Sequence, residues 1–487
     1  MHDKPREHCG VVAVASVTDA YYYLIPALRA LQHRGQESAG IAIFNGTATI
    51  CIKNLGLVDS VFKKTDPVPQ GGAGIGHTYY SIKLSKPENA QPHVISTAAG
   101  DISVAHNGII VNSGALMDEL KKKGHAFITG SEEESMAYIL SDELLKLKVL
   151  NSANVVKAIK VMMRKLSGSY TLVLAIGGMV FAVRDPFGIK PLCIGRLQDG
   201  YIAASESVAV DVLDGQLVRD VSPGEVIELF SDEYKSYNLV RYKNPAHCFF
   251  EWVYFARTDA IIDQRCVYET RKRIGWRLAK ERPVDADIIV PIPDSGRAHA
   301  FGFSLGSGIP LAEGLIKNRY IDRTFIMPDQ GSRESNVREK VNPIKSVIDG
   351  SRVVIVDDSI VRGTTMRRIV GILRKAGAKE VHVRIGSPPI ISPCYLGIDM
   401  TYRGQLLASD KEVPNICREI TADTLGYISI DGLVEALQKP KADLCLGCVT
   451  GEYPIEIEGE KKRFHPSLDD FQKDPVKKAG KKQKKDN

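Results

Sequence analysis

Residues 353–365 read Val-Val-Ile-Val-Asp-Asp-Ser-Ile-Val-Arg-Gly-Thr-Thr, and they decide the fold of the second half of the chain. The first four are β-branched and apolar, which predicts a buried parallel strand rather than a helix. Asp357 and Asp358 stand at the carboxyl end of that strand, where open α/β sheets place their ligands. The glycine and two threonines then open a helical pattern over residues 366–377. Such a helix start binds anions, and neighbouring carboxylates can hold ribose hydroxyls or a cation, so a sugar phosphate with Mg²⁺ is the expected ligand.

The two adjacent carboxylates could instead do no more than cap the following helix. A single Asp in a strand-to-helix loop usually has that role, but two before a Gly-Thr-Thr turn favour a ligand site. The segment resembles the 5-phosphoribosyl-1-pyrophosphate (PRPP) loop of the type I phosphoribosyltransferases. This resemblance implies that Asp357 and Asp358 face the ribose hydroxyls. It also implies that the 5-phosphate is bound by Ser359, Arg362, Gly363, Thr364 and Thr365.

A second predicted strand, residues 287–293, ends in the small polar turn Asp294, Ser295 and Gly296, which suits backbone contact with an anion. Most turns of this kind only reverse the chain and bind no ligand. Beside the first loop, however, this one resembles the pyrophosphate-binding loop of the same fold. The resemblance implies an Mg²⁺ site made by Ser295, Asp357 and Asp358.

A stretch rich in basic residues lies between the two loops and runs from Lys317 to Lys340. It resembles the flexible loop that closes over PRPP, with Lys317 as a PRPP contact and positive charge to offset a leaving pyrophosphate. An exposed loop of mixed charge is the alternative.

The composition is that of an ordinary globular protein, with 25% charged and 44% hydrophobic residues. We find no apolar run of about 18 residues and no secretory signal, so we expect a cytoplasmic protein without a membrane span. The net charge of +6 lies entirely in the tail, because residues 461–487 hold ten Lys or Arg against four Asp. Nothing aromatic is interleaved with these lysines, so we expect a solvated, disordered tail over residues 456–487 rather than a nucleic-acid site.

The chain divides into two halves of different pattern. The first half mixes strand and helix, with a strand predicted over 168–176 and a helix over 135–145. The second half alternates strand and helix, with parallel strands predicted over 287–293, 353–356 and 381–385. The pattern changes near residues 242–245, so we predict domains over residues 9–242 and 243–455.

Cys9 begins a strand pattern, and a single Cys in that place usually only packs. Three further segments, residues 31–40, 74–81 and 104–108, change this interpretation. Together with Cys9 they resemble the glutamine amidotransferase domain of the N-terminal-nucleophile hydrolases. Removal of residues 1–8 would then free an α-amino group that serves as the base. The resemblance implies an oxyanion hole made by Asn107 and Gly108, and glutamine contacts from Arg34, His77, Tyr79 and Glu132.

Taken together, residues 9–455 resemble the amidophosphoribosyltransferase family. The resemblance implies an N-terminal αββα sandwich followed by a type I phosphoribosyltransferase domain with a parallel sheet, an α/β (α+β) chain. It implies the reaction of glutamine, PRPP and water to 5-phosphoribosylamine, glutamate and pyrophosphate, the first step of de novo purine synthesis. The resemblance also implies that Cys9 hydrolyses glutamine and that the ammonia passes internally to PRPP. The family also leads us to expect a homo-oligomer, dimer or tetramer, and purine nucleotides as feedback inhibitors.

Two residues depart from the family pattern. Tyr79 stands where the family has the arginine that binds the glutamine α-carboxylate, and Glu132 stands where it has an aspartate for the α-amino group. Losing a buried charge partner typically costs about 2–5 kcal/mol of binding. Either another group compensates, or the glutaminase is weak. In the second case the alternative is a phosphoribosyltransferase that uses ammonia or another amine. A PRPP-sensing regulator without catalysis is a further alternative, although the sequence contains no helix-turn-helix pattern.

Nine cysteines in a reducing compartment are expected to be free, catalytic or metal-bound. Residues 445–448 form a CxxC pair, which alone is only suggestive. The family resemblance adds two further cysteines, and four thiolates suit a [4Fe–4S] cluster, with Zn²⁺ as the alternative occupant. The implied ligands are Cys248, Cys394, Cys445 and Cys448.

Overall fold

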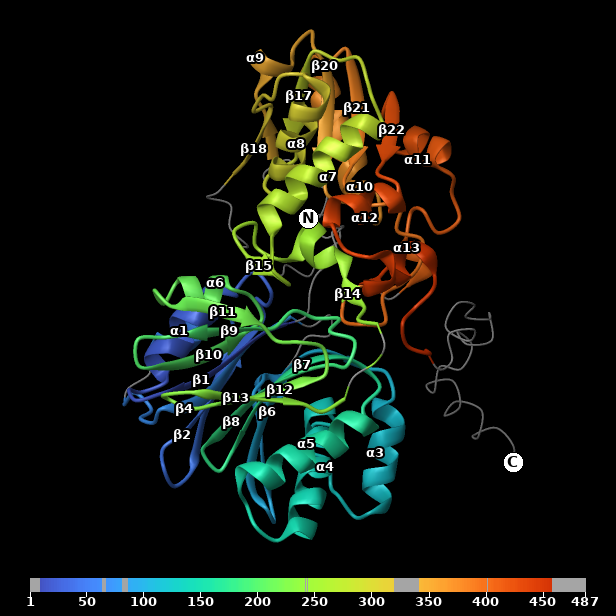
Figure 1. Ribbon diagram of the computed structural model, residues 1–487. Coiled ribbons are helices and arrows are strands. Elements are labelled where there is room, and N and C mark those ends of the chain that lie inside the picture. The colour runs from blue at the N-terminus through green and yellow to red at the C-terminus, as the bar shows by residue number, and fades with distance from the viewer. Residues whose placement is uncertain are drawn as a thin grey trace, which may run out of the picture.

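The computed structural model describes residues 9–63, 67–80, 86–240, 242, 244–318, 341–400 and 402–457. The predicted prosegment (1–8), most of the predicted flexible loop (319–340) and most of the predicted tail (458–487) lie outside these residues. Figure 1 shows two bodies, one built from the first half of the chain and one from the second. Among the described residues, no helix has the length and apolar character needed to cross a membrane.

The first body contains two antiparallel sheets packed face to face (Figure 1). The first sheet has the order β11 (Gln216–Asp220), β9 (Cys193–Arg196), β10 (Gly200–Ala204), β1 (Cys9–Ser16), β4 (Ala73–Tyr79), β2 (Ser38–Phe44), β3 (Thr49–Leu55). The second sheet has the order β13 (Tyr234–Asn238), β12 (Glu225–Leu229), β8 (Met179–Arg184), β7 (Gly168–Ile176), β6 (Gly100–Ile110), β5 (His93–Thr97).

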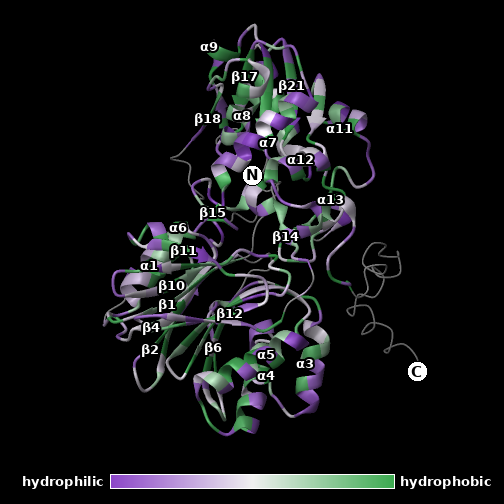
Figure 2. Cartoon of the chain, viewed as in Figure 1, coloured by the Kyte–Doolittle hydropathy of each residue, from purple (hydrophilic) through white to green (hydrophobic). Residues whose placement is uncertain are grey.

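Helices cover the outer face of each sheet, which gives the predicted αββα sandwich. On the first sheet lie α1 (Tyr21–Ala30), α2 (Val58–Phe62) and α6 (Val208–Asp211). On the second lie α3 (Ser113–Lys122), α4 (Glu132–Leu147) and α5 (Ser152–Lys165), whose apolar residues form one core with that sheet. Figure 2 shows hydrophobic and hydrophilic residues alternating around these helices. Because strand residues alternate between faces, Val11, Ala105 and Val173 fill a separate core between the sheets.

The second body contains a parallel sheet of order β17 (Ile288–Pro291), β20 (Arg352–Asp357), β21 (Glu380–Ile385), β22 (Thr424–Tyr427). Val354 and Val356 pack toward one face and Val353 and Ile355 toward the other, which explains the uninterrupted apolar run. The first face is covered by α7 (Val267–Glu281), α8 (Arg297–Ser307) and α12 (Ile430–Leu437). The second is covered by α10 (Thr364–Lys375) and α11 (Val413–Glu419).

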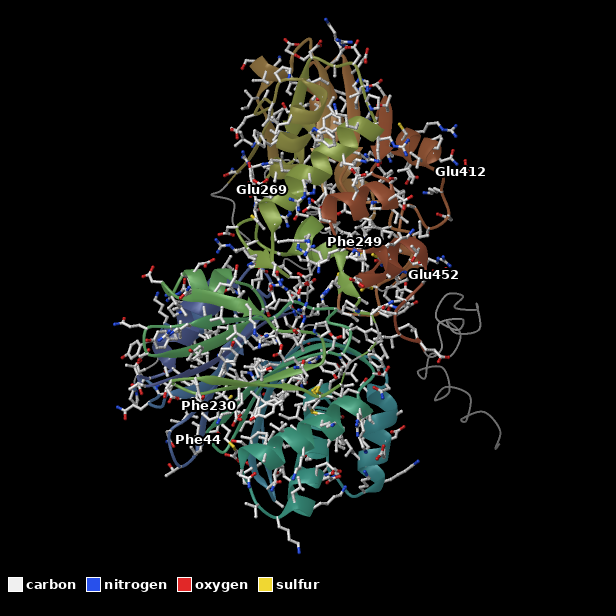
Figure 3. The ribbon with its side chains drawn as sticks, in the orientation of Figure 1. Phe44, Phe230, Phe249, Glu269, Glu412 and Glu452 are labelled. Atoms are coloured by element: carbon white, nitrogen blue, oxygen red, sulfur yellow. The ribbon has the colours of Figure 1, made fainter. Side chains whose placement is uncertain are left out.

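Short elements surround this sheet and connect it to the first body. They are β15 (Ile261–Ile262), β16 (Arg265–Cys266), β18 (Leu315–Lys317), β19 (Val341–Pro343), α9 (Lys345–Ile348) and α13 (Gly447–Thr450). In addition, β14 (His247–Cys248) pairs in parallel with β23 (Leu444–Cys445), and a π-helical turn covers Glu251–Phe255. Phe249 is fully buried between the two bodies, where Figure 3 labels it, and it belongs to a hydrophobic core that includes residues of both.

Candidate active sites

The predicted nucleophile lies between the two sheets. Cys9 is buried at the start of β1, and Asn107 is fully buried on β6 of the facing sheet. Val11 and Ala105 belong to the core between the sheets. Since strand side chains alternate, Cys9 and Asn107 also face this space.

The amide oxygen and nitrogen of Asn107 are both buried without a hydrogen-bond partner. A buried polar group without a partner is costly in a folded protein. The next residue, Gly108, has a φ of 149°, and a methyl group there would lie 2.0 Å from the Ser169 carbonyl oxygen. The backbone at position 108 therefore requires glycine. The Asn107 amide, without a partner among the described residues, is available to bind a reacting oxygen.

His77 lies on β4, two residues before Tyr79, with their ring centroids 5.7 Å apart. Its Nε2 atom is 3.0 Å from the carbonyl oxygen of His106. Burial lowers the pKa of His77 to about 3, so the ring is neutral and donates to that carbonyl. His77 thereby connects the first sheet to the strand that carries Asn107.

Glu132 belongs to a buried charge network at the start of α4. One of its oxygens accepts a hydrogen bond from the Ile110 N–H at 3.0 Å and lies 3.2 Å from Nε2 of His106. The other ring nitrogen of His106 is 2.7 Å from Glu133. Burial alone would lower the pKa of His106, but the carboxylates of Glu133 and Glu132 raise it to about 10. Nothing in the sequence pattern singled out Glu133 and His106, although both adjoin predicted residues.

Arg34 is buried at the junction of the two bodies. Its guanidinium pairs with Glu206, and its Nη2 atom is 2.8 Å from Glu251 of the π-helical turn. Glu206 also accepts from His33 at 2.7 Å, and Lys190 lies 3.5 Å from Glu251. These partners were not predicted, because 172 and 217 positions of chain separate Arg34 from the two glutamates.

The two predicted PRPP loops meet at the carboxyl edge of the parallel sheet. The strands β17 and β20 are neighbours, and a methyl group at Gly296 would lie 2.4 Å from the carbonyl oxygen of Val356. Ser295 Oγ is 3.5 Å from Oδ1 of Asp357. Lys317, on β18, lies 3.2 Å from Asp294 of the same loop. The structure thus brings the residues of both loops together.

The first loop is held by contacts within itself. Ser359 Oγ donates to Asp358 at 2.6 Å, and the Asp358 N–H donates to Asp357 at 3.0 Å. Gly363 has a φ of 79° and caps α10, so Thr364 and Thr365 form the first turn of that helix. Arg362 donates to Gln405 at 2.6 Å. The loop therefore leads directly into the start of α10, where anions bind in many proteins.

A buried arginine connects this site to the junction. Arg271, on α7, donates to the carbonyl oxygens of Trp252 and Tyr254 within the π-helical turn and of Ala256 directly after it. Burial lowers the pKa of Arg271 to about 10, and the carboxylate of Asp358 opposes that effect. The sequence contained no signal for this residue, because a helical arginine is usually exposed.

The four predicted cluster cysteines gather where β14 meets β23. Cys248 pairs in register with Cys445, and none of the four cysteines forms a disulfide within the described residues. Burial raises the pKa of Cys248, Cys445 and Cys448, to about 12 for Cys445, and the neighbouring cysteines raise each further. In the described part of the chain, no group of three or more His, Cys, Asp or Glu side chains is close enough to hold a metal ion.

Comparison with known proteins agrees with this two-part arrangement. Residues 77–211 match a glutamine amidotransferase domain, and residues 268–385 match a phosphoribosyl transferase domain. An amidophosphoribosyltransferase of Methanocaldococcus jannaschii is 50% identical over 475 residues, which cover 93% of this chain and 99% of the relative. One of Methanothermobacter thermautotrophicus is 47% identical over 93% of this chain and 95% of the relative. The glutamine PRPP amidotransferase of Bacillus subtilis, solved with ADP and GMP, is 39% identical, with a TM-score of 0.85 over 93% of this chain and 98% of the solved one.

Proposed function

The chain belongs to the amidophosphoribosyltransferase family, and from this premise we propose which residues carry each half of the reaction. The reaction converts glutamine, PRPP and water into 5-phosphoribosylamine, glutamate and pyrophosphate, the first step of purine synthesis. It uses a glutaminase and a phosphoribosyltransferase site, which we assign to residues 9–242 and 243–455. The unpartnered amide of Asn107, facing the same space as Cys9, is the observation that carries the assignment.

In the glutaminase site, Cys9 is the nucleophile after removal of residues 1–8. Its α-amino group takes the thiol proton, and the sulfur attacks the glutamine side-chain amide. The carbonyl oxygen becomes negative and accepts hydrogen bonds from the Asn107 amide and the Gly108 N–H. The α-ammonium group returns its proton to the amide nitrogen as the C–N bond breaks, so ammonia leaves, and water then hydrolyses the thioester to glutamate and the free thiol.

Glutamine recognition in this proposal depends on Glu132 and Tyr79. The Ile110 N–H and His106 hold the Glu132 carboxylate, which would bind the substrate ammonium group. Tyr79 would donate a hydrogen bond from its hydroxyl group to the α-carboxylate of glutamine, in place of the charged contact that an arginine makes. His77 and Arg34 support the site, Arg34 through its ion pairs with Glu206 and Glu251.

In the phosphoribosyltransferase site, Asp357 and Asp358 bind the ribose hydroxyls with Mg²⁺, to which Ser295 adds a hydroxyl oxygen. Hard oxygen ligands of this kind suit Mg²⁺. The pyrophosphate is held by Asp294, Ser295, Gly296 and Lys317. The 5-phosphate is held by Ser359, Arg362, Gly363, Thr364 and Thr365. Ammonia then displaces pyrophosphate from the ribose.

We further propose that Cys248, Cys394, Cys445 and Cys448 hold a [4Fe–4S] cluster. Neighbouring cysteines raise the pKa of Cys248, Cys445 and Cys448, and a bound cation that displaces the thiol protons would relieve this cost. A [4Fe–4S] cluster holds its four thiolates further apart than a single metal ion does. Cysteines arranged for such a cluster therefore need not lie within the ligand distance of one shared metal ion. The cluster would supply structural cross-links between the segments that carry its ligands.

Other features of the proposal concern location and partners. None of the cysteines forms a disulfide within the described residues, which fits a reducing, cytoplasmic location. Purine nucleotides are proposed as feedback ligands, and the solved Bacillus subtilis relative was complexed with ADP and GMP. We also propose a homo-oligomer. The second candidate function is an ammonia-dependent phosphoribosyltransferase, which Tyr79 favours.

The test is anaerobic pyrophosphate release from PRPP and Mg²⁺, with glutamine or ammonia as the donor, in the wild type and a Cys9→Ala variant. Glutamine activity that is lost in the variant, together with intact ammonia activity, supports the two-site assignment. Activity with ammonia alone would favour the second candidate. Loss of both activities in the variant would contradict the role given to Cys9.

A further inference from the structure

A segment of the second body lies against the oxyanion residue of the first. Gly397 has a φ of 100°, and a methyl group there would lie 3.3 Å from Cα of Gly108 and 2.9 Å from Cε of Lys190. No side chain fits at position 397 without displacing one of them. The chain beside Gly108 is therefore built from residues far along the sequence, in a segment that begins at Cys394.

Hydrogen bonds fix this segment to the first body. Ser169 Oγ donates to the Leu396 carbonyl oxygen at 2.8 Å, and Lys190 Nζ donates to the Gly397 carbonyl oxygen at 3.2 Å. Ser169 and Lys190 are both fully buried, so these bonds are made without competition from water. Inside the segment, the Leu396 N–H donates to Cys394 Sγ at 3.4 Å.

Ser169 lies next to both Gly108 and the segment that begins at Cys394. It lies on β7, and its carbonyl oxygen is the atom that a side chain at Gly108 would meet at 2.0 Å. Its hydroxyl group meanwhile binds Leu396. A shift of the segment is thus transmitted through one residue to the backbone that carries the Gly108 N–H.

Lys190 adds a second restraint from the opposite direction. Its ammonium lies 3.5 Å from Glu251, which in turn binds Arg34. The position of Gly397 is therefore linked to the buried ion pairs at the junction of the two bodies.

We propose that the segment Cys394–Gly397 positions the oxyanion hole, with Ser169 and Gly397 as positioning residues that hold the Gly108 N–H in place. The inference rests on the proposed function, because it assigns this N–H to glutamine hydrolysis. It predicts that the two nitrogen sources, glutamine and ammonia, respond differently to changes in the segment. Hydrolysis of glutamine depends on the segment, whereas attack of free ammonia on PRPP does not use the oxyanion hole.

The test compares Ser169→Ala and Gly397→Ala with Gly404→Ala, a control at which a methyl group meets no atom within 4 Å. In the otherwise intact protein, kcat and KM are measured for pyrophosphate release with glutamine and with ammonia. Complete loss of one oxyanion donor costs about 10²–10³ in kcat, so a displaced donor is expected to cost about tenfold in Ser169→Ala and more in Gly397→Ala. KM for glutamine and kcat with ammonia are expected to stay within about twofold, as both are in the control.

A second readout does not depend on turnover. The rate at which a diazoketone analogue of glutamine alkylates Cys9, followed by mass spectrometry, should fall in Ser169→Ala and not in Gly404→Ala. Equal loss of glutamine and ammonia activities would overturn the inference, because the segment would then support the whole fold. Unchanged kcat and alkylation in both variants would overturn it too. If the wild type lacks glutamine activity, the proposed function fails, while the alkylation rates still decide this inference.

Discussion

Tyr79 lies directly opposite Cys9 in the antiparallel pairing of β1 and β4. Opposed residues of an antiparallel pair project to the same face, with Cβ atoms typically about 4.5–5.5 Å apart. One of the two residues that depart from the expected family pattern is therefore a direct neighbour of the nucleophile. This position makes the glutamine pocket the part of the chain where substitutions are most informative.

Replacing Tyr79 with Arg is expected to strengthen glutamine binding. A guanidinium offers the substrate carboxylate a charged, bidentate partner, and such a contact is worth about 2 kcal/mol or more when buried. KM for glutamine should fall at least about tenfold, while KM for PRPP stays unchanged. Steady-state kinetics of pyrophosphate release measures both. An unaltered KM for glutamine would mean that another group already binds the carboxylate.

Replacing Asn107 with Ala should lower kcat with glutamine by about 10²–10³-fold, because one oxyanion donor is lost. Among the described residues the amide has no hydrogen-bond partner, so its removal breaks no hydrogen bond there and the melting temperature should change little. Ammonia-dependent activity serves as the internal control and should persist. A parallel loss of ammonia-dependent activity would refute the assignment of Asn107 to the glutaminase.

Local pattern predicted the elements whose burial follows a regular rule, continuous along the strand and one-sided along the helix. The strand over 168–176 and the helix after the PRPP loop both formed as expected, because their apolar periodicity is contained in a few consecutive residues. The four-residue strand β22 was not predicted, since its sequence is too short to show a period. The partners of Arg34 were missed for another reason. Long-range ion pairs leave no signal in neighbouring residues, and only the fold brings them together.

Replacing Gly363 with Ala should weaken PRPP binding. The residue has a φ of 79°, and a methyl group would lie 2.4 Å from Cδ2 of Leu407. Relief of this contact moves the start of α10, where Thr364 and Thr365 stand, and we expect KM for PRPP to rise about tenfold, a cost of about 1.4 kcal/mol. The control is Gly371→Ala in the middle of the same helix, where no atom lies within 4 Å. That variant should keep its KM and gain about 0.5–1 kcal/mol of stability.

Replacing Glu251 with Gln should destabilise the protein strongly. Glu251 is buried and faces Arg34 at 2.8 Å and Lys190 at 3.5 Å, so the variant leaves buried cations without their full counter-charge. Breaking a buried pair typically costs about 3–5 kcal/mol. The matched control is Glu269→Gln, whose exposed pair with Lys272 is worth about 1 kcal/mol or less. Thermal unfolding of both variants measures the difference, and equal melting temperatures would contradict the importance given to the junction.

The network of His106 and Glu133 predicts how stability depends on pH. The pKa of His106 is raised to about 10 in the folded protein, above its ordinary value of 6.5. The stabilisation is therefore complete below about pH 6.5 and is lost as the pH rises toward 10, by at most about 1.4 kcal/mol per pH unit. In Glu133→Gln the largest contribution raising that pKa is absent, so the variant should be less stable than the wild type at pH 7. The difference in melting temperature should narrow between pH 7 and 9, because only the wild type still has this stabilisation to lose. A difference that stays constant over that range would show that His106 is not held protonated by Glu133.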